Sequence, residues 1–219
     1  MITGDYSGDL IEGVRDGNGK LTWSNGDFYQ GTFKNGLRHG RGTFEESKNG
    51  LTYEGEWALS MREGFGVQKW SNGDSYEGMF SKDKMSGKGI MQTSSGKYEG
   101  LYKEGFKEGL GTFEYKNGCR YEGLWKENRF HGKGMFSWPN GRKYEGNWEN
   151  GLRNGEGIMI LSSGEKHDGH YKDNLMHGSG WWRFTNGKVR PGEWKHDKLS
   201  KWTGPEQFEA QMRAKRGMN

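Results

Sequence analysis

Histidine is the residue type in this chain best suited to acid–base or metal chemistry, and there are six copies of it. His167 and His170 lie three residues apart in an extended stretch, where side chains alternate between faces, so the two rings cannot hold one metal ion together. His196 is isolated. The remaining three hold equivalent places, each directly before a Gly-x-Gly in a segment that recurs along the chain: His39, His131 and His177. We interpret them as turn residues of a repeat and predict no metal site.

The Gly-x-Gly motifs, the cysteine and the paired acids are the other candidates for chemistry. A phosphate-binding Gly-x-Gly needs a third glycine three residues on and a helix after it. In every copy here that glycine is missing and an extended stretch follows. Cys119 has no histidine in its own segment and adjoins a turn glycine, and Glu45 with Glu46 is typical of loop charge. We therefore predict that the chain is not an enzyme, has no catalytic residues and binds no cofactor.

These motifs are positioned by an internal repeat of 22 to 24 residues. Each copy opens with Tyr-x-Gly or a decayed form of it, carries Gly-x-Gly about half-way along, and closes with a turn such as Asn25-Gly26. Nearly all of the 40 glycines fall at fixed places in this period, so glycine is structural here. The copies open at Tyr6, Tyr29, Tyr53, Tyr76, Tyr98, Tyr121, Tyr144, His167 and Arg190, which gives eight full units and a truncated ninth.

Short turns at both ends of each unit predict antiparallel hairpins. Asn-Gly pairs such as Asn25-Gly26 and Asn72-Gly73 suit the two positive-φ positions of a type I′ turn. A second tight turn is expected seven residues after each opening, where Gly36, Asp83 and their equivalents tolerate a left-handed backbone. The chain is therefore expected to be all-β, an elongated single-layer antiparallel array of hairpins. Its strands, about 4.8 Å apart, would form a ribbon roughly 80 Å long that twist curls into a trough.

The two-residue period of a strand places large rings and a glycine on one face, as in Tyr53, Gly55 and Trp57. We expect rings to lie over the glycine backbone of neighbouring strands, with the frequent glutamate after each tyrosine on the other, solvated face. The array is assigned to residues 1–202. From Thr203 the sequence changes character, and Pro205 followed by EQFEAQMRAKR predicts a short C-terminal capping helix within residues 203–219.

The composition limits the kinds of protein to which this chain can belong. An aromatic content of 14% argues against disorder, and 40 glycines with only 3 prolines exclude collagen. No basic leader or long apolar run suggests secretion or a membrane span, so we expect a cytoplasmic protein. The formal net charge of +4 comes from basic residues spread along the chain, and no nucleic-acid partner is expected.

The segments YEGEWALSMREGFGVQKWSNG, YEGLWKENRFHGKGMFSWPNG and YEGNWENGLRNGEGIMILSSG resemble MORN repeats (membrane occupation and recognition nexus). The resemblance covers residues 6 to about 194, and the decayed first, eighth and ninth units fit capping units. It implies a non-catalytic scaffold whose β trough binds partner segments. Such scaffolds pair as homodimers or associate end to end. It also implies a place in cytoskeletal or ciliary assemblies, such as the radial-spoke heads of an axoneme.

The aromatic face is the candidate binding groove, because a single-layer sheet has no second layer to cover one face of its rings. A helical or extended segment of a protein partner could bury them. The predicted groove residues belong to the central units: Tyr53, Trp57, Tyr76, Phe80, Tyr98, Tyr102, Tyr121, Trp125, Tyr144 and Trp148.

Two alternatives stay open. The chain could be the targeting subunit of a separate enzyme, with catalysis supplied by that partner. It could instead tether a membrane to the cytoskeleton by meeting anionic phospholipid through basic residues at the loop edges. The candidates for that contact are Arg38, Arg41, Lys88, Arg129, Lys133 and Arg153.

Overall fold

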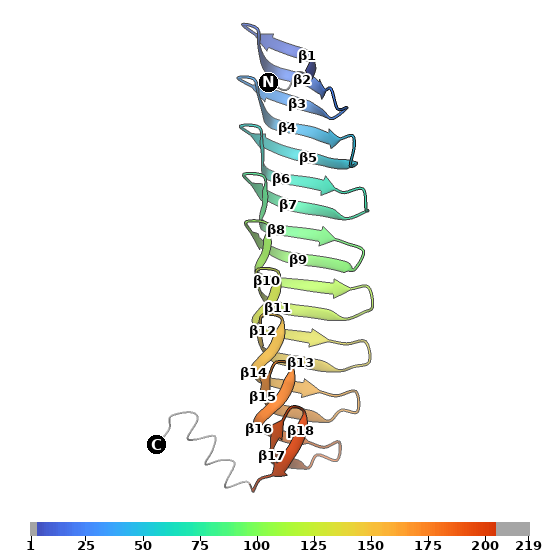
Figure 1. The fold of residues 1–219 in the computed structure, drawn as a ribbon, viewed down its shortest axis with the longest axis vertical. Coiled ribbons are helices and arrows are strands. Elements are labelled where there is room, and N and C mark those ends of the chain that lie inside the picture. Colours follow the sequence, from blue (N-terminus) through green and yellow to red (C-terminus); the bar gives the residue numbers. More distant parts are fainter. Residues whose placement is uncertain (1–3, 205–219) are drawn as a thin grey trace, which may run out of the picture. The chain divides into compact units, whose positions relative to one another are not determined.

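The computed structural model describes residues 4–204, and they form antiparallel β-strands joined by tight turns (Figure 1). The chain divides into two compact units, Met1–Glu108 and Gly109–Asn219. The strands of the first unit are β1 (Gly4–Ile11), β2 (Val14–Trp23), β3 (Phe28–Lys34), β4 (Leu37–Glu46), β5 (Leu51–Ala58), β6 (Met61–Lys69), β7 (Ser75–Ser81), β8 (Lys84–Gln92) and β9 (Gly96–Lys103).

The division falls inside β10 (Phe106–Tyr115), which pairs with β11 from Gly109 onward. The strands that follow are β11 (Arg120–Lys126), β12 (Arg129–Ser137), β13 (Lys143–Glu149), β14 (Leu152–Ile160), β15 (Lys166–Lys172), β16 (Leu175–Arg183), β17 (Val189–Lys195) and β18 (Lys198–Trp202). Within each unit every strand pairs with the next strand of the chain, which makes an open antiparallel sheet. The predicted all-β array of hairpins is confirmed. The predicted C-terminal helix lies outside the described residues, apart from Thr203 and Gly204.

The two kinds of turn correct one prediction and confirm another. At the Asn-Gly turns only the glycine is left-handed: Gly26 has φ of 90°, and Asn25 is not among the positive-φ residues. The Asn25 side-chain carbonyl accepts a hydrogen bond from the Asp27 N–H (3.1 Å), which holds the turn without a left-handed asparagine. The type I′ turns predicted there are therefore wrong. The second turn is confirmed, because Lys82 and Asp83 have φ of 47° and 67°, the two positive values of a type I′ turn.

Glycines pair with glycines between the strands of a repeat, and the side chain that opens the repeat, a tyrosine or His167, lies over the pair. In the first unit Gly55 is directly opposite Gly66, and a Cβ added to Gly66 would lie 2.4 Å from the Tyr53 hydroxyl oxygen. The hydroxyl donates to the carbonyl oxygen of Glu56 (3.0 Å), just where a β-bulge interrupts the pairing. The tyrosine thus donates to a carbonyl at the bulge, and only glycine leaves room for its ring.

The rings interlock along each unit. Trp57 stands edge-on to Tyr29 and Tyr53, with ring centroids 5.3 and 5.1 Å apart. In the second unit Trp148 stands in the same way between Tyr121 and Tyr144, at 5.5 and 5.2 Å. Such edge-to-face pairs contribute about 0.5–1.5 kcal/mol each beyond the burial of their area. The core of each unit is therefore a zigzag of aromatic rings packed edge to face.

Candidate functional site

The ten residues predicted to line an aromatic groove are all buried. Their relative exposures run from 0% for Tyr53, Tyr76, Tyr98, Tyr121 and Tyr144 to 6% for Trp148. The expectation that a single-layer sheet leaves these rings uncovered is therefore wrong. The structure brings together the members within each unit, but as a core rather than as an accessible surface: Tyr53, Trp57, Tyr76, Phe80, Tyr98 and Tyr102 in the first, and Tyr121, Trp125, Tyr144 and Trp148 in the second.

Side chains from the second strand of several hairpins cover the rings. Arg38 places its guanidinium carbon 4.2 Å from the centroid of the Trp57 ring. In the second unit Phe130 stacks on Tyr121, with centroids 3.7 Å apart. Arg153 covers Tyr144, with its guanidinium carbon 5.5 Å from the centroid of the ring. These residues all lie nine places after the tyrosine of their repeat, so this position supplies the layer that the sheet itself lacks.

Burial on this face shifts the pKa of its titratable groups in the direction of the neutral form. It raises the pKa of Tyr76 to about 12, and it lowers the pKa of the Lys107 ammonium, which lies 4.8 Å from the Tyr98 ring centroid, to about 8. The pKa of Arg38 is likewise lowered, chiefly by burial. The main cause of these shifts is the packing of the aromatic face.

His167 stands where the other repeats have tyrosine. It is 1% exposed, and its Nδ1 is 2.8 Å from the Tyr171 hydroxyl oxygen. Burial lowers its pKa to about 4. His170 faces the other way and approaches Glu156 (4.0 Å), as the alternation of a strand requires. Within residues 4–204 no group of three or more His, Cys, Asp or Glu side chains could hold a metal ion.

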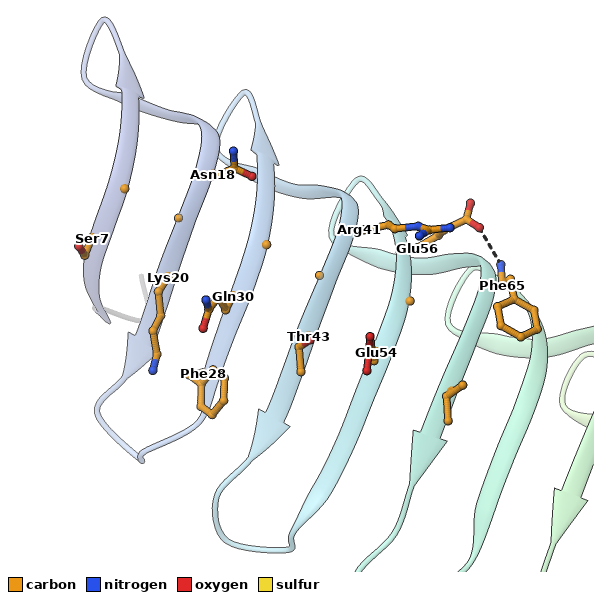
Figure 2. A pocket seen from close by; sticks show the side chains of 16 residues that line it. Ser7, Asn18, Lys20, Phe28, Gln30, Arg41, Thr43, Glu54, Glu56 and Phe65 are labelled. Atoms are coloured by element: carbon orange, nitrogen blue, oxygen red, sulfur yellow. Dashed lines mark hydrogen bonds between the residues drawn. The ribbon is translucent and has the colours of Figure 1, made fainter.

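The opposite side of the sheet, which we call the open face, is the accessible one. In the first unit it is hollowed into a groove of about 1110 Å³. Its floor is glycine backbone, and one row of side chains crosses it from strand to strand: Ser7, Lys20, Gln30, Thr43 and Glu54 (Figure 2). Phe65 lies at its far end with 47% of its surface exposed, and the Phe65 N–H donates to Glu56 Oε1 (3.3 Å).

In the second unit the open face holds two adjoining hollows of about 650 and 720 Å³, which share Met135, Glu145, Ile158 and Asp168. Acidic and apolar residues alternate along one row of cross-strand partners: Glu122, Met135, Glu145, Ile158, Asp168 and Trp181. A parallel row two residues along the strands carries the bases Lys143, Lys166 and Arg183, together with the apolar residues Ile160 and Val189. We call these two rows together the ladder groove.

The sequence predicted only that the acidic row lies on a solvated face. Ile158, 38% exposed, is directly paired with Asp168, and the apolar residues opposite the acids went unnoticed. The sequence does contain this information, because strand pairing places Ile158, fourteen residues after Tyr144, beside Asp168, the second residue of the next repeat. The residues that face one another on paired strands reveal these apolar side chains.

The six basic residues proposed to meet a membrane do not share an edge. Arg38 and Arg153 lie over rings on the aromatic face. Lys133 lines the open face, with Arg41 and Lys88 at equivalent places in other repeats, and Arg129 opens β12 beside a turn. Within each unit these candidates therefore lie on both faces of the sheet and not along one loop edge. No helix long and apolar enough to cross a membrane occurs between residues 4 and 204.

A family model for the MORN repeat matches the chain at residues 6–28, 29–45, 53–75, 76–97, 98–120, 121–141, 144–166 and 167–189. These matches cover most of the chain, which therefore belongs to the MORN-repeat family, as the resemblance implied. No curated protein sequence matches it significantly.

Some solved structures are distantly similar. The TCP domain of SAS-4 (dCPAP) from Drosophila melanogaster, in complex with a proline-rich motif of Ana2 (dSTIL), is 15% identical with a TM-score of 0.45, and the match covers 77% of this chain and 90% of that one. A mutant of the TCP10 domain of Danio rerio CPAP is 11% identical with a TM-score of 0.35, covering 85% and 88%. Similarity this low says nothing about what the present chain binds.

Proposed function

We propose that this protein is a non-catalytic scaffold that binds a segment of a partner protein on its open face. The observation that carries the proposal is the contrast between its two faces. The rings of the aromatic face are covered by the protein's own side chains, whereas Ile158 and Phe65 stay 38% and 47% exposed in grooves of the open face. Exposed apolar side chains gathered in a concavity are typical of a protein-binding surface.

Membership of the MORN-repeat family is consistent with this proposal, and it carries the narrower expectations stated from the sequence. A cytoskeletal or ciliary assembly, a cytoplasmic location, and homodimers or end-to-end association remain predictions. The membrane tether is less well supported, because within each unit its basic residues lie on opposite faces of the sheet and so cannot meet one lipid surface together.

The test uses two variants of the same strand. Ile158→Glu places a charge in the ladder groove, and Leu152→Glu changes an equally exposed residue of β14 (38% each) that does not line the groove. Proximity labelling with the tagged chain in its own cells should lose its main neighbours with Ile158→Glu and keep them with Leu152→Glu. Loss of about tenfold or more is expected, since a buried unpaired charge costs at least 1.4 kcal/mol. If both variants label the same neighbours as the wild type, the ladder groove is not the binding site.

A further inference from the structure

In the ladder groove the apolar residues lie on every second strand: Met135 (β12), Ile158 with Ile160 (β14), and Trp181 (β16). These strands also carry charged residues two places along, Lys133, Glu156 and Arg183. The strands between them carry an acid and a base each, Glu145 with Lys143 (β13) and Asp168 with Lys166 (β15). Neighbouring strands lie about 4.8 Å apart, so apolar contact points recur at about 9.6 Å across the groove.

This spacing matches one type of backbone. A polyproline II segment rises about 3.1 Å per residue with three residues per turn, so every third side chain returns to the same face after about 9.3 Å. An α-helix brings a side chain to one face about every 5.4 Å, which would place residues over the charged strands as well. A β-strand returns to one face after about 6.7 Å and falls out of step at the second contact.

The charges of the groove favour the same occupant. A polyproline II backbone has no internal hydrogen bonds, so its carbonyl oxygens need donors. Lys143, Lys166 and Arg183 line the groove and have only donors to offer. An α-helix has already paired its carbonyls and gains nothing from them.

The acidic row favours a bound segment that carries basic side chains. Neither Glu145 nor Asp168 forms an ion pair with any residue in the 4–204 range. On β11, by contrast, Glu122 is already paired with Arg120 at 2.5 Å. The unpaired acids thus lie from β13 to β15, within the stretch that carries the apolar contact points.

On these grounds, and resting on the proposed function, we propose that the ladder groove binds a basic, proline-rich segment in the polyproline II conformation. Every third residue of the segment is apolar and contacts in turn Met135, Ile158 and Trp181. Its basic side chains meet Glu145 and Asp168. Lys143, Lys166 and Arg183 donate to its backbone carbonyls.

The test measures binding of synthetic peptides to the full chain by fluorescence anisotropy. The probe repeats Leu-Pro-Arg over about nine residues, enough to span β12 to β16 at 3.1 Å per residue. It should bind at least about tenfold more tightly than a Leu-Pro-Glu peptide, and than a peptide of the same composition with leucine at every fourth place. Its affinity should fall as salt is added.

Variants localise the effect. Glu145→Lys should weaken the Leu-Pro-Arg peptide about tenfold, and Glu149→Lys, at the other end of β13, should not. Equal binding of the Arg and Glu peptides would overturn the proposal, as would tighter binding of a helical peptide with leucine at every seventh place. If no such peptide binds while Ile158→Glu still removes the neighbours in cells, this inference fails and the proposed function stands. If Ile158→Glu removes nothing, the proposed function fails as well.

Discussion

The tyrosine and the paired glycines of each repeat form one packing unit. The ring of Tyr53 occupies the space that a side chain on Gly66 would fill, and its hydroxyl satisfies a carbonyl at the bulge. The sequence placed the rings over glycine correctly, because the two-residue period of a strand fixes which residues share a face. It could not show the hydroxyl contact, which depends on the bulge that follows Gly55.

Replacing Gly66 with alanine should lower the free energy of unfolding by about 1–3 kcal/mol, because the new Cβ overlaps the Tyr53 ring. Gly73→Ala is the matched control. Its Cβ would meet nothing within 4 Å, and only the backbone strain at φ of 86° remains, about 1 kcal/mol. Urea unfolding of both variants checks this prediction. Equal losses would mean that the ring does not require the glycine.

His167 should make the second unit sensitive to acid. Its folded pKa, about 4, lies below its usual 6.5 because the ring is buried, so the unfolded chain binds the proton more tightly. Its contribution to stability is complete above about pH 6.5 and is lost as the pH falls from there to about 4. The loss is roughly 3 kcal/mol.

Urea unfolding at pH 7 and at pH 4 measures this effect. His167→Tyr should show a smaller loss on acidification than the wild type, and tyrosine beside tyrosine at this place has a precedent in Tyr98 and Tyr102. His39→Asn changes an exposed histidine of the first unit and should behave as the wild type. If His167→Tyr and the wild type lose the same stability, the buried imidazole is not the cause.

At the scale of the hairpin, the sequence predicted tight turns at both ends but assigned one of their types wrongly. Asn-Gly suits two turn types, and the choice depends on whether the asparagine side chain bonds to the following backbone, as Asn25 does with Asp27. At the other end, the residue before the predicted turn position is also left-handed, even where it is Leu59, with φ of 51°. That turn type therefore follows from the twist of the strands rather than from a residue preference.

Leu59 is strained and 66% exposed, so its replacement should stabilise the protein. Leu59→Asn should raise the free energy of unfolding by about 1 kcal/mol, since asparagine tolerates a left-handed backbone and Asn35 and Asn150 occupy the same place in other repeats. Leu59→Ala removes the exposed side chain but not the strain, and it should give little gain. Thermal unfolding distinguishes the two variants. Equal gains in stability would show that backbone strain at Leu59 does not lower the stability of the protein.

The faces of the hairpin show where site prediction failed. Composition and period identified the rings, but not the layer over them, because Arg38 and Arg153 read as ordinary surface charges until their nine-residue distance from a tyrosine is noticed. We therefore expect Trp148→Ala to cost about 3–5 kcal/mol of stability, as a core substitution does, instead of removing binding alone. A variant that keeps the urea midpoint of the wild type would show that Trp148 is not core.

At the scale of the whole molecule, the repeat uses one set of residues to fold and another to present a surface. The tyrosine, glycine and second-ring positions recur in nearly every unit, whereas the open face varies from polar in the first repeats to alternating acid and apolar in the ladder groove. A sequence period reveals the recurring set readily. The acids of the open face share that period, but the apolar residues opposite them vary from unit to unit and become visible only when the pairing of strands is known.

The central claim is that the partner lies on the open face, and photo-crosslinking from single positions tests it most directly. A crosslinking residue is placed at Ile158 on the open face, at Phe136 on the aromatic face and at Leu152 beside a turn, each in the full chain in its own cells. The account predicts a discrete crosslinked partner from position 158, and none from 136 or 152. A partner captured from position 136 but not from 158 would contradict it and return the binding site to the aromatic face.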